Sequence, residues 1–151
     1  MTSALPPEIQ RLWARTRLHL WPETYMLVSL PRELAAPAAL LAGRATGFAA
    51  LVLERDEASL ALAEGLWRAS ELRGRERAVQ GALRVLTFDI DLDLDVCGYL
   101  APAAQRLAAA SVSIVPQCGF LKDHLLLPAA KAEQACAVLE QLIAEAQAEL
   151  A

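Results

Sequence analysis

The stretch LRVLTFDIDLDLDV, residues 83–96, has the most regular pattern in the chain. In its second half, apolar residues alternate with four aspartates, Asp89, Asp91, Asp93 and Asp95. A period of two places successive side chains on opposite faces of a β-strand. We therefore predict a strand over these residues, with the apolar side chains facing a core and the carboxylates facing solvent.

The sequence after this strand predicts a helix, two strands and a second helix. Gly98 ends the strand, and apolar residues at helical spacing predict a helix over residues 99–110. Two further strands are predicted over residues 111–115 and 124–127, on either side of a loop that contains Gly119. From residue 129 to 150, apolar positions recur at helical spacing opposite glutamates, which predicts an amphipathic helix.

The first half of the chain predicts the same order of elements. The β-forming run TYMLVSL is followed by Pro31, which removes a backbone donor where a strand should stop. The charged run ERDEA separates two apolar stretches and indicates an exposed hairpin turn. The predicted elements are strand 24–30, short helical pieces within 33–42, strands 48–53 and 59–63, and a helix within 65–80 that fades into a charged linker.

The order strand, helix, strand, strand, helix therefore occurs twice, which predicts two ferredoxin-like βαββαβ units of the α+β class. Right-handed crossovers give each unit an antiparallel sheet with its helices on one face. Residues 83–86 can supply the fourth strand of the first unit, residues 21–82. The second unit, residues 83–151, has no strand after its last helix. We predict that the alternating run TRLHL, residues 16–20, returns to complete it and interlocks the two units.

Composition excludes several classes of protein. A net charge of −4 gives little attraction for phosphate backbones, so nucleic acid is not an expected partner. Charges interrupt every apolar run, so no membrane span is expected. The first residues lack the basic and apolar segments of a secretory signal, and a cytoplasmic location is expected. Cys97, Cys118 and Cys136 are odd in number and widely spaced, which indicates free thiols.

The chemical motifs do not indicate an enzyme, a metal site or a cofactor. A calcium loop starting at Asp89 would need glycine at Leu94 and glutamate at Leu100. Cys118, His124 and Asp123 could form a thiol triad, but no acyl-transfer signature surrounds them. The chain also lacks the glycine-rich motifs that bind phosphates.

Two loops, residues 95–98 and residues 117–123, are expected to meet. The two parallel strands of a βαβ crossover end at the same edge of the sheet, and each of these loops follows one of those strands. The first free N–H groups of the helix after Gly98 can hold a carboxylate, and Asp95 or Asp123 can pair with an ammonium group. In the alternative reading, Gly98 only relieves backbone strain and Asp123 only caps a hairpin. The candidate ligand-binding residues are Asp95, Val96, Cys97, Gly98, Gln117, Cys118, Phe120 and Asp123.

Residues 83–127, with Gly98 opening a helix and the run LAAASVSIVPQCGFLKDHLLL after it, resemble the small tandem ACT proteins of bacteria. That family is related to the regulatory domains of aspartate kinases and to CASTOR-type arginine sensors. The resemblance extends more weakly to WPETYMLVSLPRE and FAALVLERDEASLALAEG. It implies a ligand pocket between the two units, with Gly98 as the family's loop glycine and Asp123 as the acidic residue ahead of the third strand.

The sequence differs from the family pattern in both loops. Relatives often have a Ser-Thr-Tyr-like loop where this chain has QCGF, and Ser-Leu-Thr before the glycine where it has DVC. The leading hypothesis is a non-enzymatic regulatory module that holds an amino acid between its units. The alternative is a structural or interaction module that assembles with itself, as a homo-oligomer, or with a partner protein.

Overall fold

The computed structural model describes residues 5–151 and divides the chain into two compact units. One unit consists of Met1–Leu20 together with Leu86–Ala151, and the other of Trp21–Val85. Strand β5, Ala78–Asp89, belongs to both units: residues 78–85 are part of the Trp21–Val85 unit, and residues 86–89 are part of the other. We expected a boundary between residues 82 and 83, inside this strand. Within the described residues, no helix is long and apolar enough to span a membrane.

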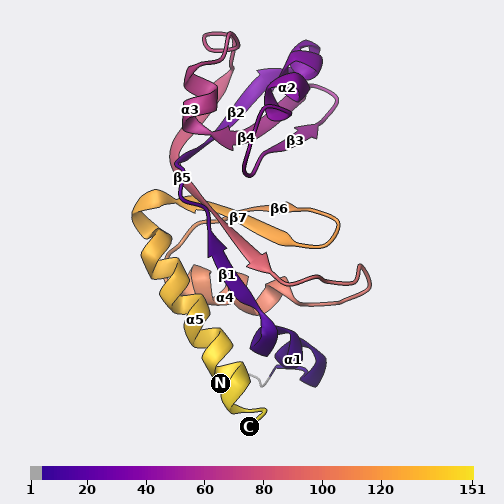
Figure 1. Ribbon diagram of the computed structural model, residues 1–151, viewed down its shortest axis with the longest axis vertical. Helices are drawn as coiled ribbons and strands as arrows, with labels where there is room; N and C mark the ends of the chain where they lie inside the picture. Colours follow the sequence, from indigo (N-terminus) through magenta and orange to yellow (C-terminus); the bar gives the residue numbers. More distant parts are fainter. Residues whose placement is uncertain (1–4) are drawn as a thin grey trace. The chain divides into compact units, whose positions relative to one another are not determined.

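The Trp21–Val85 unit is a ferredoxin-like βαββαβ fold (Figure 1). Its strands lie in the order β3-β4-β2-β5, and each neighbouring pair is antiparallel. Val28, Leu30, Leu60 and Leu62 are buried under the helices in one apolar core. The elements are β2 Tyr25–Pro31, 3-10 helix η1 Arg32–Leu34, α2 Ala35–Ala42, β3 Ala50–Leu53, β4 Glu57–Ala63, α3 Glu64–Arg68 and the first part of β5.

The other unit repeats this fold and begins with an additional helix. Its strands lie in the order β1-β5-β7-β6, and β1 supplies the edge strand, with Leu18 opposite Phe88 and Leu20 opposite Leu86. The α+β class and the antiparallel sheets with helices on one side are confirmed. The elements are α1 Pro7–Arg15, β1 Arg17–Leu20, the end of β5, α4 Leu100–Ala109, β6 Val115–Cys118, β7 Asp123–Pro128, η2 Ala129–Lys131 and α5 Ala132–Ala148.

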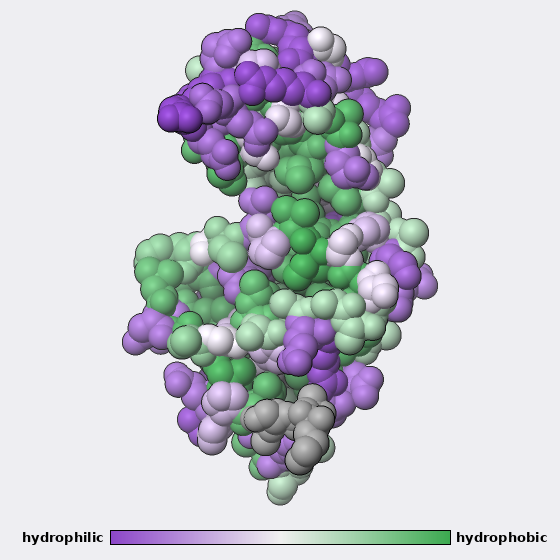
Figure 2. Space-filling view, turned by 180° about the vertical axis from the view of Figure 1, so that it is seen from behind, coloured by the Kyte–Doolittle hydropathy of each residue, from purple (hydrophilic) through white to green (hydrophobic). Residues whose placement is uncertain are grey.

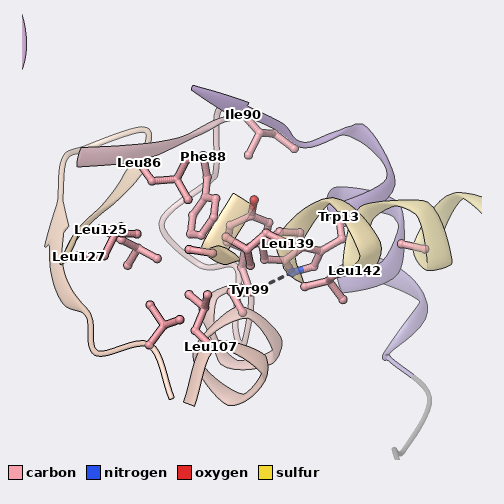
Figure 3. Close-up of a cluster of buried hydrophobic side chains, with 14 of the residues drawn as sticks. Trp13, Leu86, Phe88, Ile90, Tyr99, Leu107, Leu125, Leu127, Leu139 and Leu142 are labelled. Carbon is pink, nitrogen blue, oxygen red and sulfur yellow. Dashed lines mark hydrogen bonds between the residues drawn. The ribbon is translucent and has the colours of Figure 1, made fainter. Parts of the chain in front are cut away.

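The core of this second unit is built around aromatic side chains from three segments (Figure 3). The Trp13 ring from α1 lies parallel to the Tyr99 ring, with centroids 4.8 Å apart and an interplanar angle of 6°. It meets Phe88 edge-on at 5.2 Å, and leucines of β5, β7, α4 and α5 surround the group. Burying three aromatic rings together makes them a large share of this unit's packing energy.

The prediction of a strand through residue 96 was wrong. Strand β5 ends at Asp89, and residues 90–98 form a loop in which Leu94 is 74% exposed. The ladder stops there because both neighbouring strands also end at this edge: β1 begins at Arg17, opposite Asp89, and β7 begins at Asp123. An alternating sequence without neighbouring strands has no backbone partners and cannot extend a sheet.

Two other boundaries also differ from prediction. The helix expected within residues 65–80 ends at Arg68, and residues 78–85 instead continue the sheet, with Val79 opposite Val28. The strand expected over residues 111–115 starts only at Val115. Before it, Ser111 has a φ of 56°, and the Val112 N–H bonds the Leu107 carbonyl, so the chain is still leaving the helix.

Candidate ligand-binding site

A cavity of about 310 Å³ lies where residues 92–101 meet residues 118–123. The first segment leads from β5 into α4, and the second is the β6–β7 hairpin loop. Every lining residue belongs to the unit formed by residues 1–20 and 86–151. The volume is at the lower end of the range of small-molecule sites, roughly 300–1,000 Å³.

Five of the eight residues predicted for the site line this cavity: Val96, Gly98, Cys118, Phe120 and Asp123. The other three, Asp95, Cys97 and Gln117, are not among the lining residues. Asp95 and Cys97 are exposed on the 90–98 loop, and Gln117 lies on β6 opposite His124.

Gly98 has a backbone conformation that favours glycine. Its φ is +88°, in the left-handed region where a Cβ atom is strained. A Cβ built there would meet no atom within 4 Å, so the requirement comes from the backbone rather than from crowding. Gly98 lines the cavity, and helix α4 begins two residues later at Leu100.

The amino end of α4 forms part of the cavity wall. Leu100 and Ala101 are the first two residues of the helix and line the cavity, and Pro102 follows them without an N–H group. N–H groups in the first turn of a helix have no partner within the helix. In the described chain, no side chain caps this end. The amides of Leu100 and Ala101 can therefore receive an anionic group.

Tyr99, between Gly98 and α4, is fixed by the amino-terminal segment. The Trp13 Nε1–H donates to the Tyr99 carbonyl at 3.0 Å, and the Thr16 Oγ1 and the Tyr99 hydroxyl are 2.7 Å apart. Burial raises the pKa of Tyr99, so the phenol remains protonated at neutral pH. These contacts fix the residue that follows the turn at Gly98.

Sequence reasoning missed these supporting residues because it assigned no structure before residue 16. The signal is present in PEIQRLWAR, residues 7–15. Proline stands at the first helical position, Glu8 is in the first turn, and Ile9 and Trp13 are four residues apart.

Asp123 faces the Cys118 thiol across the start of the hairpin. Burial, together with a hydrogen bond to Asp123 and the charge of that carboxylate, raises the pKa of Cys118 to about 11. The thiol is protonated at neutral pH and is a poor nucleophile. The His124 Nδ1 lies 2.7 Å from the Thr87 hydroxyl, and burial lowers its pKa, so the imidazole is neutral. This environment does not favour a thiolate–imidazolium pair.

The four aspartates of residues 89–95 are exposed, as predicted, and two of them pair with a lysine of the β6–β7 hairpin. Lys122 pairs with Asp91 and lies 3.3 Å from the Asp89 carboxylate, which connects the 90–98 loop to the hairpin. The Leu92 N–H adds a backbone bond to the Leu121 carbonyl. No group of three or more metal-binding side chains converges anywhere in residues 5–151. The acidic run thus helps to position one wall of the cavity.

The rim of the cavity exposes apolar side chains. Leu94 is 74% exposed, Phe120 76% and Leu121 47%. Figure 2 shows hydrophobic residues at the tip of the β6–β7 hairpin, beside hydrophilic residues of the 90–98 loop. Such a group on a small protein is suited to contact with a ligand or another protein.

No protein-family model matches the chain, and no curated protein matches its sequence. Solved structures do match. The protein Atu0741 from Agrobacterium tumefaciens superimposes with a TM-score of 0.70 at 21% identity, over 85% of this chain and 90% of that one. VC0802 from Vibrio cholerae, described as a protein of unknown function and possible transport protein, gives 0.65 at 20% identity, over 87% and 94%.

The regulatory subunit of aspartate kinase from Thermus thermophilus, in its ligand-free form, also matches. Its TM-score is 0.61 at 12% identity, over 84% of this chain and 97% of that one. These matches cover both units and show that the chain has the ACT-like, ferredoxin-like fold of aspartate kinase regulatory subunits.

Proposed function

We propose that this protein is a regulatory module that binds a free amino acid in the cavity between residues 92–101 and residues 118–123. The observation that carries the proposal is that one cavity is lined both by hydrogen-bond donors suited to an anion and by a carboxylate suited to a cation. Amide donors at the start of α4 lie on one wall, and the half-buried Asp123 carboxylate lies on another.

The two walls match the two charged groups of an amino acid. The ligand carboxylate accepts hydrogen bonds from the Leu100 and Ala101 amides, where the helix dipole also favours negative charge. The ligand ammonium pairs with Asp123 in a charge-assisted hydrogen bond. Leu92, Val96 and Phe120 supply apolar surface for a side chain.

The structural comparisons support this assignment through the fold that the chain shares with aspartate kinase regulatory subunits. A small chain with that fold and no motif for catalysis suits a sensing role. The side chains that differ from the family pattern, Cys118 and Phe120, line the cavity and would determine which amino acid is accepted.

A thermal-shift screen of the twenty standard amino acids at millimolar concentration tests the proposal. A ligand that binds only the folded state, at about 100 times its dissociation constant, stabilises the protein by about 2.7 kcal/mol. We expect one amino acid, or a small related group, to raise the melting temperature. The absence of any shift across the screen would contradict the proposal.

The alternative is an interaction module, favoured by the exposed side chains of Leu94, Phe120 and Leu121. In that case the rim is covered by another protein chain rather than completed by a ligand. A Phe120→Ser variant would then lose self-association or partner binding in sedimentation measurements. Under the leading proposal, the same variant changes ligand affinity and leaves the sedimentation coefficient unchanged.

A further inference from the structure

The Trp21–Val85 unit has a separate cavity of about 300 Å³ at the opposite end of its fold. The site proposed above lies where β5 ends and α4 begins in the other unit. This second cavity is built where β2 begins, where α2 leads into β3, and where β4 leads into α3. It therefore occupies a different position in the fold and is not a copy of the first site.

The corresponding end of the other unit is filled. There, the chain leaving α4 buries Val112, which is 3% exposed, and Ile114 packs against the same core. In the Trp21–Val85 unit, the chain leaving α2 has Thr46, Gly47 and Phe48 instead, and these residues line the cavity. Two units of one topology thus differ in whether this end is packed or open.

Gly47 helps to keep the cavity open. A Cβ atom at this position would lie 3.2 Å from the Trp21 ring and 3.5 Å from the Tyr25 hydroxyl. The first distance is closer than ordinary van der Waals contact, so a larger residue would displace the ring or push the loop. The loop can pass this close to Trp21 because the residue is glycine.

The mouth of the cavity carries two opposite charges, Glu23 and Arg44, both exposed. The Tyr25 hydroxyl donates to the Glu23 Oε2 at 3.3 Å and fixes that carboxylate. Burial, with the charge of Glu23 and this hydrogen bond, raises the pKa of Tyr25 to about 12, so the phenol remains a donor. A carboxylate has two oxygens, and Oε1 remains available to accept from a cation.

The Arg44 guanidinium has no ion pair or side-chain hydrogen bond within residues 5–151. Arginine can bind a carboxylate through two parallel N–H donors. The wall below the charges is apolar and aromatic: Leu66, Ala63 and Phe48 line it, and Phe48 meets Tyr25 edge-on with ring centroids 6.1 Å apart. Aromatic rings in this arrangement offer edges and faces to a third ring.

From these features we infer that this second cavity binds a small zwitterion with an apolar, preferably aromatic, side chain. Its ammonium pairs with Glu23, its carboxylate pairs with Arg44, and its side chain enters the aromatic wall. The inference does not depend on the proposed function, because the two cavities share no residue.

Glycine amide signals can report on the two cavities separately in one experiment. The chain has seven glycines. Gly47 and Gly65 line the second cavity, whereas Gly98 and Gly119 line the first. The full-length chain, labelled with 15N-glycine and assigned, is titrated with L-phenylalanine. The same titration is made with 3-phenylpropionate, which lacks the ammonium, and with phenethylamine, which lacks the carboxylate.

We expect L-phenylalanine to shift the Gly47 and Gly65 signals, and both analogues to bind about fivefold more weakly, as for loss of one exposed ion pair. Arg44→Gln and Glu23→Gln should each weaken L-phenylalanine binding to the same extent. Both residues are exposed, so the variants should fold. Arg55→Gln is the matched control, because Arg55 is 92% exposed at the β3–β4 turn, and it should leave binding unchanged.

The inference fails if L-phenylalanine leaves Gly47 and Gly65 unshifted, or if either analogue binds as well as the zwitterion. It also fails if Arg44→Gln and Glu23→Gln bind with wild-type affinity. Shifts confined to Gly98 and Gly119 would contradict this inference while supporting the proposed function. The two claims can therefore fail independently.

Discussion

The Trp13 indole stacks on the Tyr99 ring and also donates a hydrogen bond to the Tyr99 carbonyl at 3.0 Å. One side chain from the amino-terminal helix thus fixes both the ring and the backbone of the residue that follows Gly98. Both groups are buried. The turn at the proposed site is held by a segment more than eighty residues away in sequence.

Trp13→Phe tests this contact. Phenylalanine preserves much of the stacking but leaves the buried Tyr99 carbonyl without its donor, which typically costs about 1–3 kcal/mol. We expect the free energy of unfolding, measured by chemical denaturation, to fall by this amount. Trp13→Ala should cost more, about 3–5 kcal/mol, because it also leaves a cavity. Equal stability of Trp13→Phe and the wild type would show that the hydrogen bond is unimportant.

Gly98→Ala tests the backbone requirement at the turn. Alanine at a φ of +88° is strained although the space is open, and we expect a loss of about 1–2 kcal/mol in the free energy of unfolding. Gly65→Ala is the matched control: its Cβ also meets nothing within 4 Å, but the residue lies in helix α3 without a positive φ. That variant should be neutral or slightly stabilising. A Gly98→Ala protein as stable as the Gly65→Ala protein would contradict the assignment of strain.

The Cys118 thiol should react slowly with iodoacetamide near neutral pH, with a rate that rises toward its pKa of about 11. Asp123→Asn removes the charge that helps to raise this pKa. The pKa should fall, and alkylation at a fixed pH should be faster. Burial is the largest cause of the shift, so the variant's pKa should remain above that of a peptide thiol. Peptide mass spectrometry follows the rate, and slower alkylation in the variant would contradict the proposed coupling.

Asp91→Asn should destabilise the protein by less than about 1 kcal/mol, because its pair with Lys122 is largely exposed. The loss should diminish at high salt, which screens exposed charges. Asp93→Asn serves as the control, since Asp93 is exposed and forms no ion pair within the described residues. A loss of several kcal/mol for Asp91→Asn would instead require a buried partner.

The order of elements from residue 16 onward could be predicted because each depends on a local signal. The β-forming run ending at Pro31 and the amphipathic pattern of α5 are examples. The meeting of the Gly98 turn with the β6–β7 hairpin followed from topology alone, since strands on either side of a crossover end at one edge. This is why five of the eight predicted residues line the cavity.

The rest depends on contacts that no local pattern encodes. The alternation in residues 89–95 is compatible with a strand, and only the ends of β1 and β7 decide that β5 stops at Asp89. The role of Tyr99 depends on a helix distant in sequence. The second cavity exists because no side chain fills that end of the Trp21–Val85 unit, and Gly47 is the main example. The periodicity of apolar residues predicts helices and strands but does not show where the packing between them is incomplete.

A calorimetric titration of the wild type and Asp123→Asn, with the amino acid that gives the largest thermal shift, tests whether Asp123 binds the ligand ammonium. Loss of one partner from a desolvated charge pair costs about 2–5 kcal/mol, so binding to Asp123→Asn should weaken by at least tenfold. Its melting temperature without ligand should be nearly unchanged, and Asp56→Asn, a substitution of an exposed aspartate in the β3–β4 turn of the other unit, should bind as the wild type does. Wild-type affinity in Asp123→Asn, with a lowered melting temperature, would make Asp123 a turn residue and contradict the proposed site.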